Sequence, residues 1–263
     1  MIFNNSSYIY IMELIRTDKD DIRMLYQLLY DIDAIFIKNK IHYWVDGGTL
    51  LGAIRHQGII PWDDDVDIGI LEKDILKFEE CIDAINECGY DICPFYWGYK
   101  IFSIRGTPIK KNRWQDHVSK FRNLGLNRAE TFKIASLSYK KSTEQQYYDY
   151  TYPNIDLFVS KHHQNKVFYN SRDYCEFPQD WQKCEFNTTD LFPLKRYKFG
   201  AFEVNGANNP NVYLDLIYGN DWFTHGYQQY SHKIEKKIVK KKVKLNEHDR
   251  KPATPITLLR KAS

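Results

Sequence analysis

Long apolar runs are missing from this sequence, since no stretch approaches the roughly 20 apolar residues that a membrane-spanning helix requires. Residues 1–12 contain no basic cluster ahead of an apolar core and carry several polar side chains, which is not the pattern of a signal peptide. Internal repeats and nucleic-acid-binding motifs are absent as well. These absences predict a cytoplasmic location and no specific nucleic acid partner.

Cysteine is scarce, with five residues in 263, and no two of them stand at the Cys-x-x-Cys spacing of common metal and redox sites. The odd number and the irregular spacing predict free thiols in a reducing compartment. One alternative stays open, a zinc site built from Cys175, Cys184 and either His162 or His163.

Basic charge is distributed unevenly along the chain. Residues 233–263 hold eleven Lys and Arg against three Asp and Glu, whereas residues 1–232 hold 26 basic against 31 acidic residues. We therefore divide the chain into an N-terminal extension (1–17), one domain (18–232) with insertions around 106–150, and a basic, flexible C-terminal tail (233–263). The tail alternates lysines with apolar residues, so peripheral contact with an anionic membrane is an alternative to a merely solubilising end.

Acidic residues are concentrated in one short block, where Asp63, Asp64, Asp65 and Asp67 fall within five positions. Like charges this close repel, and a partly buried cluster needs a cation to neutralise it. Asp65 and Asp67 are two residues apart, so on a strand they face the same side and can hold one metal ion together. Ligands that are all oxygen favour Mg²⁺ or Mn²⁺.

A glycine-rich turn precedes the acidic block. Gly47 and Gly48 leave backbone N–H groups open to a phosphate, especially if Thr49 begins a helix. Arg55, near the end of that helix, is a candidate partner for another phosphate oxygen. A carboxylate-held metal beside a phosphate-binding turn predicts phosphoryl transfer. Further candidates for phosphate binding, each with solvated charge as its alternative, are Lys100, Arg105, Lys195 and Arg196.

A calcium-binding loop is the main alternative for the acidic block. An EF-hand loop needs Glu at its twelfth position, but that position is Asp74 if the loop begins at Asp63 and Leu76 if it begins at Asp65. The surrounding strand pattern also differs from helix–loop–helix, which argues against this alternative.

Periodicity and capping residues predict an α+β (α/β-like) fold with a mixed sheet flanked by helices. Asp156 interrupts an apolar strand pattern, and such an acid either faces solvent or belongs to a site. The helix expected over 210–218 should bury Val212, Leu214, Leu216 and Ile217. The expected elements are helices over 18–40, 49–56, 73–88 and 210–218, strands over 42–45, 66–71, 91–96 and 154–159, and a hairpin over 196–205.

The block from residue 46 to residue 70 resembles the signature of the LicD/fukutin-type phosphotransferases, which have the nucleotidyltransferase fold. It contains Gly-Gly-Thr-Leu-Leu-Gly at 47–52, Arg55 and Pro-Trp-Asp-Asp-Asp-Val-Asp at 61–67. Weaker similarity continues at 155–158, 191–194 and 210–222. The resemblance implies a nucleotidyltransferase-type mixed sheet and an Mg²⁺ or Mn²⁺ site.

The resemblance also implies transfer of a phosphorylated alcohol, phosphocholine-like or polyol-phosphate-like, from a CDP-linked donor to a glycan or glycoprotein hydroxyl, with release of CMP. It implies that Asp156 is a third metal-site carboxylate beside Asp65 and Asp67, either as a ligand or as acceptor of the hydroxyl proton, with Asp63 as a further ligand candidate. Two alternatives remain: a nucleotidyltransferase that releases pyrophosphate, and an inactive member that binds glycans or assists assembly.

Overall fold

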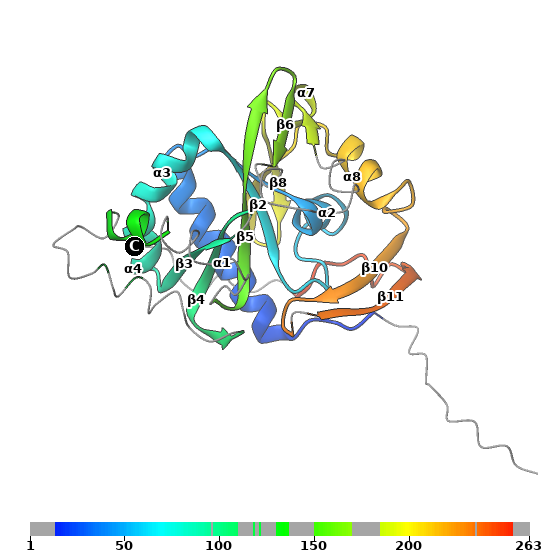
Figure 1. The fold of residues 1–263 in the computed structure, drawn as a ribbon. Coiled ribbons are helices and arrows are strands. Elements are labelled where there is room, and N and C mark those ends of the chain that lie inside the picture. Colours follow the sequence, from blue (N-terminus) through cyan, green and yellow to red (C-terminus); the bar gives the residue numbers. More distant parts are fainter. Residues whose placement is uncertain are drawn as a thin grey trace, which may run out of the picture.

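The structure, a computed structural model, describes residues 14–95, 97–109, 118, 121, 130–136, 150–169, 185–234 and 236–254 (Figure 1). Its helices are α1 (Lys19–Lys38), α2 (Gly47–Arg55), the 3₁₀ turn η1 (Glu72–Asp74), α3 (Ile75–Glu80), α4 (Ile82–Glu87), α7 (Thr188–Leu191) and α8 (Pro210–Tyr218). Its strands are β1 (Tyr43–Val45), β2 (Val66–Leu71), β3 (Tyr90–Phe95), β4 (Gly98–Pro108), β5 (Thr151–His163), β6 (Lys166–Tyr169), β7 (Glu185–Asn187), β8 (Lys195–Phe199), β9 (Phe202–Gly206), β10 (His225–Ser231) and β11 (Lys236–Lys244).

A mixed sheet organises the molecule. Its strand order is β1-β2-β5-β4-β3, with β6 added to β5 and β7 added to β6. Strands β2 and β5 run parallel, while β1–β2, β5–β4 and β4–β3 are antiparallel. In Figure 1, α3 and α4 lie to one side of β2 and β5, and α2, α8 and the β10–β11 hairpin lie to the other. The predicted α+β class with a helix-flanked mixed sheet is confirmed.

Helix α1 follows the predicted pattern. Asp18 caps it, and its side chain accepts a hydrogen bond from the backbone N–H of Asp20 at 2.8 Å. The apolar positions at helical spacing, including Leu25, Leu29 and Phe36, are fully buried in the core. Among the helices that the structure describes, none is both long enough and apolar enough to cross a membrane.

Several elements differ from the sequence prediction. The helix expected over 73–88 is interrupted at Cys81, where α3 ends and α4 begins. Strand β4 was not predicted; its first residues are buried between β3 and β5, so they lack the alternation that marks a half-exposed strand. Helix α8 buries Tyr213 and Leu214, whereas Val212 and Leu216 are 47% and 48% exposed, contrary to expectation.

Three of the cysteines fall within the described residues. Cys81, Cys88 and Cys93 are free thiols, as the spacing predicted. Cys175 and Cys184 lie outside the described residues, so of the zinc alternative the structure describes only His162 and His163, at the end of β5. Most of the expected insertion over 106–150 and residues 1–13 of the expected N-terminal extension also fall there.

The predicted flexible tail from residue 233 needs correction, because residues 236–244 form β11, which pairs antiparallel with β10. A C-terminal strap, residues 245–254, then continues along the domain and buries Leu245 and Ala253. Ala253 N–H donates to the carbonyl of Ile59 at 2.8 Å, and the Tyr26 hydroxyl donates to the carbonyl of Ala253 at 3.3 Å. Backbone pairing and these apolar anchors hold a segment whose composition alone suggested disorder. Membrane contact by its lysines stays a prediction.

We expect Leu245→Ala to lower the free energy of unfolding by about 2–4 kcal/mol, because Leu245 is only 6% exposed. The matched control is Leu76→Ala on α3, where the side chain is 62% exposed. There we expect the free energy of unfolding to change by no more than about 0.5 kcal/mol. Urea unfolding measures both. Equal, small effects would contradict the packing of the strap against the domain.

His56 connects the end of α2 to the strap through a neutral imidazole. Its Nδ1 accepts from Arg55 Nε at 3.3 Å, and its Nε2 lies 3.1 Å from the Asp249 carbonyl, which requires a proton on Nε2. Burial, with a contribution from the charge of Arg55, lowers the pKa of His56 to about 3. A second proton would bring Nδ1–H against Arg55 Nε–H.

Stability should therefore fall as the pH drops below the unfolded-state pKa of about 6.5, because the unfolded chain then binds a proton that folded His56 does not. The loss attributable to His56 is at most about 1.4 kcal/mol per pH unit between pH 6.5 and 3. We expect the stability of His56→Gln, which does not titrate, to change less over this range. Parallel losses in the two proteins, followed by urea unfolding from pH 7 to pH 5, would contradict the assignment.

Candidate active site

Three carboxylates converge where β2 and β5 begin to pair. Asp65 immediately precedes β2, Asp67 is the second residue of β2, and Asp156 is the register partner of Asp67 on parallel β5. One oxygen from each of the three lies within 4.8 Å of the others. The structure therefore brings together the three residues predicted as catalytic, although 89 positions of sequence separate Asp67 from Asp156.

The first turn of α2 packs directly against this cluster. Asp46 caps the helix, and its Oδ1 accepts from Gly47 N–H at 2.8 Å. A Cβ atom on Gly47 would lie 2.4 Å from Asp67 Oδ2, and one on Gly48 would lie 2.6 Å from Asp63 Oδ2. Gly47 also has φ of +47°, which disfavours other residues. The glycines thus let the positive end of a helix approach the carboxylates, in addition to their predicted phosphate-binding role.

The backbone of Asp67 is held on both sides by the start of α2. The Thr49 hydroxyl accepts from Asp67 N–H at 2.8 Å, and Asp46 N–H donates to the Asp67 carbonyl at 2.9 Å. The Thr49 hydroxyl therefore helps to hold the backbone of Asp67 in place. Asp63, a further predicted ligand, lies beside Gly48 and outside the Asp65–Asp67–Asp156 group.

The cluster is electrostatically crowded. Burial raises the pKa of Asp65 to about 6, and repulsion from Asp156 and Asp64 adds to the shift. Burial, followed by the charge of Asp65, also raises the pKa values of Asp67 and Asp63 well above the usual range. Protonation and cation binding are the two ways to relieve such crowding.

Lys100 supplies a buried cation beneath the cluster. Its ammonium donates to Asp156 Oδ1 and, at 2.9 Å, to Asn154 Oδ1. The same ammonium lies 4.8 Å from the ring centre of Phe95 and 4.6 Å from that of Tyr150, which are favourable cation–π distances. Lys100 was predicted only as a weak phosphate-binding candidate. Its position on β4, opposite Asp156 in the sheet, could not be recognised without the strand pairing.

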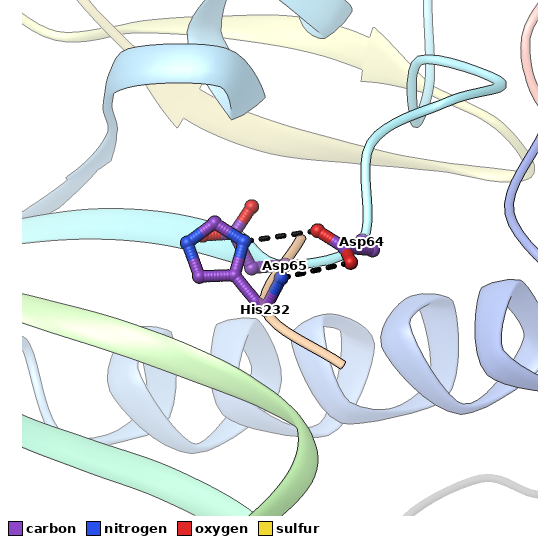
Figure 2. Close-up of side chains that lie close together, drawn as sticks. All are labelled: Asp64, Asp65 and His232. Carbon is purple, nitrogen blue, oxygen red and sulfur yellow. Dashed lines mark hydrogen bonds and ion pairs between the residues drawn. The ribbon is translucent and has the colours of Figure 1, made fainter. Parts of the chain in front are cut away.

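A second cation reaches the cluster from the turn after β10, where His232 lies between Asp64 and Asp65 (Figure 2). His232 Nδ1 is 2.9 Å from Asp64 Oδ1, and its Nε2 is 3.2 Å from Asp65 Oδ2. Burial would lower the pKa of His232, but Asp65 and Asp64 outweigh it and raise this pKa to about 10. Burial likewise opposes the shift at Asp64, yet the hydrogen bond from His232 lowers the pKa of Asp64. Sequence reasoning missed His232, because a lone histidine before a lysine-rich segment carries no local signal.

Arg55 was predicted to contact a phosphate, but its side chain is buried and binds backbone carbonyls instead. Its Nη1 donates to the carbonyls of Trp222 and His225, the latter at 2.8 Å. Burial lowers the pKa of Arg55 to about 10. The guanidinium therefore fastens the chain between α8 and β10 to α2, and its predicted contact with a phosphate stays a prediction.

The remaining predicted cations lie apart from the carboxylates. Arg105 is exposed on β4, five residues beyond Lys100 and so roughly 16 Å along the strand. Lys195 donates to the Asn208 carbonyl at 2.7 Å, and Arg196 pairs with Asp33 at 2.6 Å. Within the described part of the chain, none of these three forms an ion pair with the cluster, so any phosphate role for them remains a prediction.

The residues present fit a hard divalent cation. The three converging ligands are all carboxylates, the donor type preferred by Mg²⁺ and Mn²⁺ and poorly suited to softer metals. Their crowding, together with the raised pKa of Asp67, is the electrostatic condition that a bound cation relieves. A second group, Asp64, Asp65 and His232, also has ligand atoms within 4.8 Å of one another, but its histidine is held as a cation.

We expect Gly47→Ala to destabilise the protein more than Gly89→Ala. Both glycines have positive φ, but a Cβ at Gly89 meets no described atom within 4 Å, whereas one at Gly47 meets Asp67 Oδ2. Gly89→Ala should therefore lower the free energy of unfolding by about 1–2 kcal/mol, from backbone strain alone. Gly47→Ala should lower it by about 1–2 kcal/mol more, because the new methyl group displaces the Asp67 carboxylate. Equal losses in urea unfolding would show that the Asp67 carboxylate does not lie against α2.

Comparison with known families gives one match over this region. Residues 40–117 match the family described as LicD/FKTN/FKRP, nucleotidyltransferase domain. The matched residues include the first turn of α2, the acidic block and Lys100, while Asp156 and His232 lie beyond them.

Curated relatives extend the similarity. An uncharacterized protein of Rickettsia prowazekii is 30% identical over 197 residues, which cover 74% of this chain and 53% of that protein. The ribitol 5-phosphate transferase FKRP of Homo sapiens is 46% identical over 105 residues, covering 29% of this chain and 20% of that protein. The lipopolysaccharide cholinephosphotransferase LicD of Haemophilus influenzae is 41% identical over 80 residues, which cover 27% of this chain and 30% of that protein. The chain spans about half the length of the rickettsial relatives it matches.

Proposed function

Because the chain belongs to the LicD family through its nucleotidyltransferase domain, we propose that it is a metal-dependent phosphotransferase. In this proposal it moves a phosphorylated alcohol, phosphocholine-like or polyol-phosphate-like, from a CDP-linked donor to a glycan or glycoprotein hydroxyl and releases CMP. Two relatives support the reaction class, since the names of both describe transfer of an alcohol phosphate.

The convergence of Asp65, Asp67 and Asp156 carries the proposal. These three carboxylates would hold the Mg²⁺ or Mn²⁺ ion, with Asp63 as a nearby further candidate. A bound ion of this kind neutralises charge on the donor's phosphate oxygens and on the departing CMP.

The surrounding residues would position both the carboxylates and the donor. The first turn of α2 holds Asp67 through Thr49 and Asp46, and N–H groups at Gly47, Gly48 and Thr49 would face a donor phosphate. Gly47 N–H already donates to its capping residue, so Gly48 and Thr49 are the better candidates.

The ion pair between Lys100 and Asp156 favours one of the two roles predicted for Asp156. Oδ1 of Asp156 already accepts from the Lys100 ammonium, so with Oδ2 given to the ion no carboxylate oxygen is left to take the hydroxyl proton. We therefore assign Asp156 to the metal through its other oxygen, and not to general base catalysis.

Product analysis separates this proposal from its two alternatives. With CDP-choline, CDP-ribitol and CDP-glycerol as donors and Mn²⁺ present, release of CMP that depends on a glycan acceptor supports phosphotransfer. Release of pyrophosphate from a nucleoside triphosphate supports true nucleotidyl transfer instead. Failure to bind Mn²⁺ or any cytidine nucleotide in calorimetry supports the inactive glycan-binding or assembly role.

Asp65→Ala and Asp67→Ala should each abolish transfer, because each removes one of the converging ligands. Both variants should keep the fold without metal, since each removes a charge from a crowded cluster. Asp83→Ala on the exposed side of α4 is the matched control and should leave transfer unchanged. Full activity in either cluster variant would overturn the metal assignment.

A further inference from the structure

We propose that His232 is a positioning residue for Asp65, so that the β10–β11 hairpin belongs to the metal site although it lies beyond the matched nucleotidyltransferase residues. The inference rests on the metal in the proposed function. It assigns a role to a side chain that neither the sequence motif nor the family match contains.

The imidazole is held at both ring nitrogens. Nδ1 faces Asp64 at 2.9 Å, and Nε2 faces Asp65 Oδ2 at 3.2 Å (Figure 2). With Nδ1 fixed by Asp64, the direction of Nε2 is fixed as well, since the ring is rigid. Asp65 is in turn the residue shared by the two groups of convergent ligands. A hydrogen bond to one carboxylate oxygen orients the other oxygen. Residues that bond to a metal ligand in this way, without binding the metal themselves, raise the affinity of the site.

The contact with Asp64 alone does not explain the histidine. Asp64 Oδ2 also accepts from Ser231 Oγ at 3.2 Å, from His232 N–H at 3.0 Å and from Lys233 N–H at 3.3 Å. The turn is therefore joined to Asp64 by three bonds that need no imidazole. What the imidazole adds is the link from this turn to Asp65.

Two substitutions of His232 separate the contribution of its Nδ1 bond from that of its Nε2 bond. The amide nitrogen of His232→Asn falls near the position of Nδ1 and keeps the bond to Asp64, while that of His232→Gln falls near Nε2 and keeps the bond to Asp65. Both remove the charge of the ring equally, so the comparison between them is free of that effect. The control is His248→Asn, at an exposed histidine of the C-terminal strap.

The experiment titrates each full-length protein with Mn²⁺ alone and follows the bound ion by electron paramagnetic resonance, with thermal unfolding of the metal-free proteins in parallel. We expect His232→Asn to bind Mn²⁺ about 10–100-fold more weakly than His232→Gln. Thermal stability should show the opposite order, or no difference, because His232→Asn keeps the Asp64 bond. A purely structural histidine would give the same order in both measurements.

Equal Mn²⁺ affinity in the two variants, or tighter binding by His232→Asn, would overturn the positioning role. Two bound Mn²⁺ ions in the parent and one in both variants would also overturn it, because His232 would then be a ligand itself. Absence of Mn²⁺ binding in the parent would overturn the proposed metal-dependent function and this inference with it, whereas the first two outcomes leave that function intact.

Discussion

Repulsion among buried carboxylates is the constraint on which the rest of this structure depends. Asp65 and Asp156 are buried and Asp67 is half-buried in one small volume, so an unneutralised charge there carries a large desolvation cost. Three features offset this repulsion. Lys100 pairs with Asp156, His232 lies between Asp64 and Asp65, and the positive N-terminal end of α2 faces the cluster. Neither cation is paired with Asp67, whose pKa burial and the charge of Asp65 raise well above the usual range.

Polar contacts from α2 and from the acidic block add to the apolar anchors that hold the C-terminal hairpin and strap against the domain. Arg55 binds the carbonyls that lead into β10, His56 binds the strap, and His232 returns from the hairpin to the acidic block. Each contact joins α2 or the acidic block to residues beyond 220. The turn that leads into the lysine-rich segment thus contributes His232 to the surroundings of the carboxylates.

The sequence predicted those parts whose signals are local. Strand β2, the glycine turn and the pairing of Asp65 with Asp67 all follow from spacing within one short stretch, and the resemblance added Asp156. Lys100 and His232 could not be assigned, because their roles arise from strand pairing and from a hairpin that returns from far along the chain. The tail was misjudged for a related reason, since charge composition does not reveal a partner strand or the burial of Leu245.

The most direct test of the account is the location of the metal. Crystals grown with Mn²⁺ can be examined for anomalous scattering, which marks the ion itself. The account predicts a peak bounded by Asp65, Asp67 and Asp156, with carboxylate oxygens at about 2.0–2.3 Å, as hard divalent ions require. A peak between Asp64 and His232 with none among the three carboxylates, or no peak at either position, would contradict it.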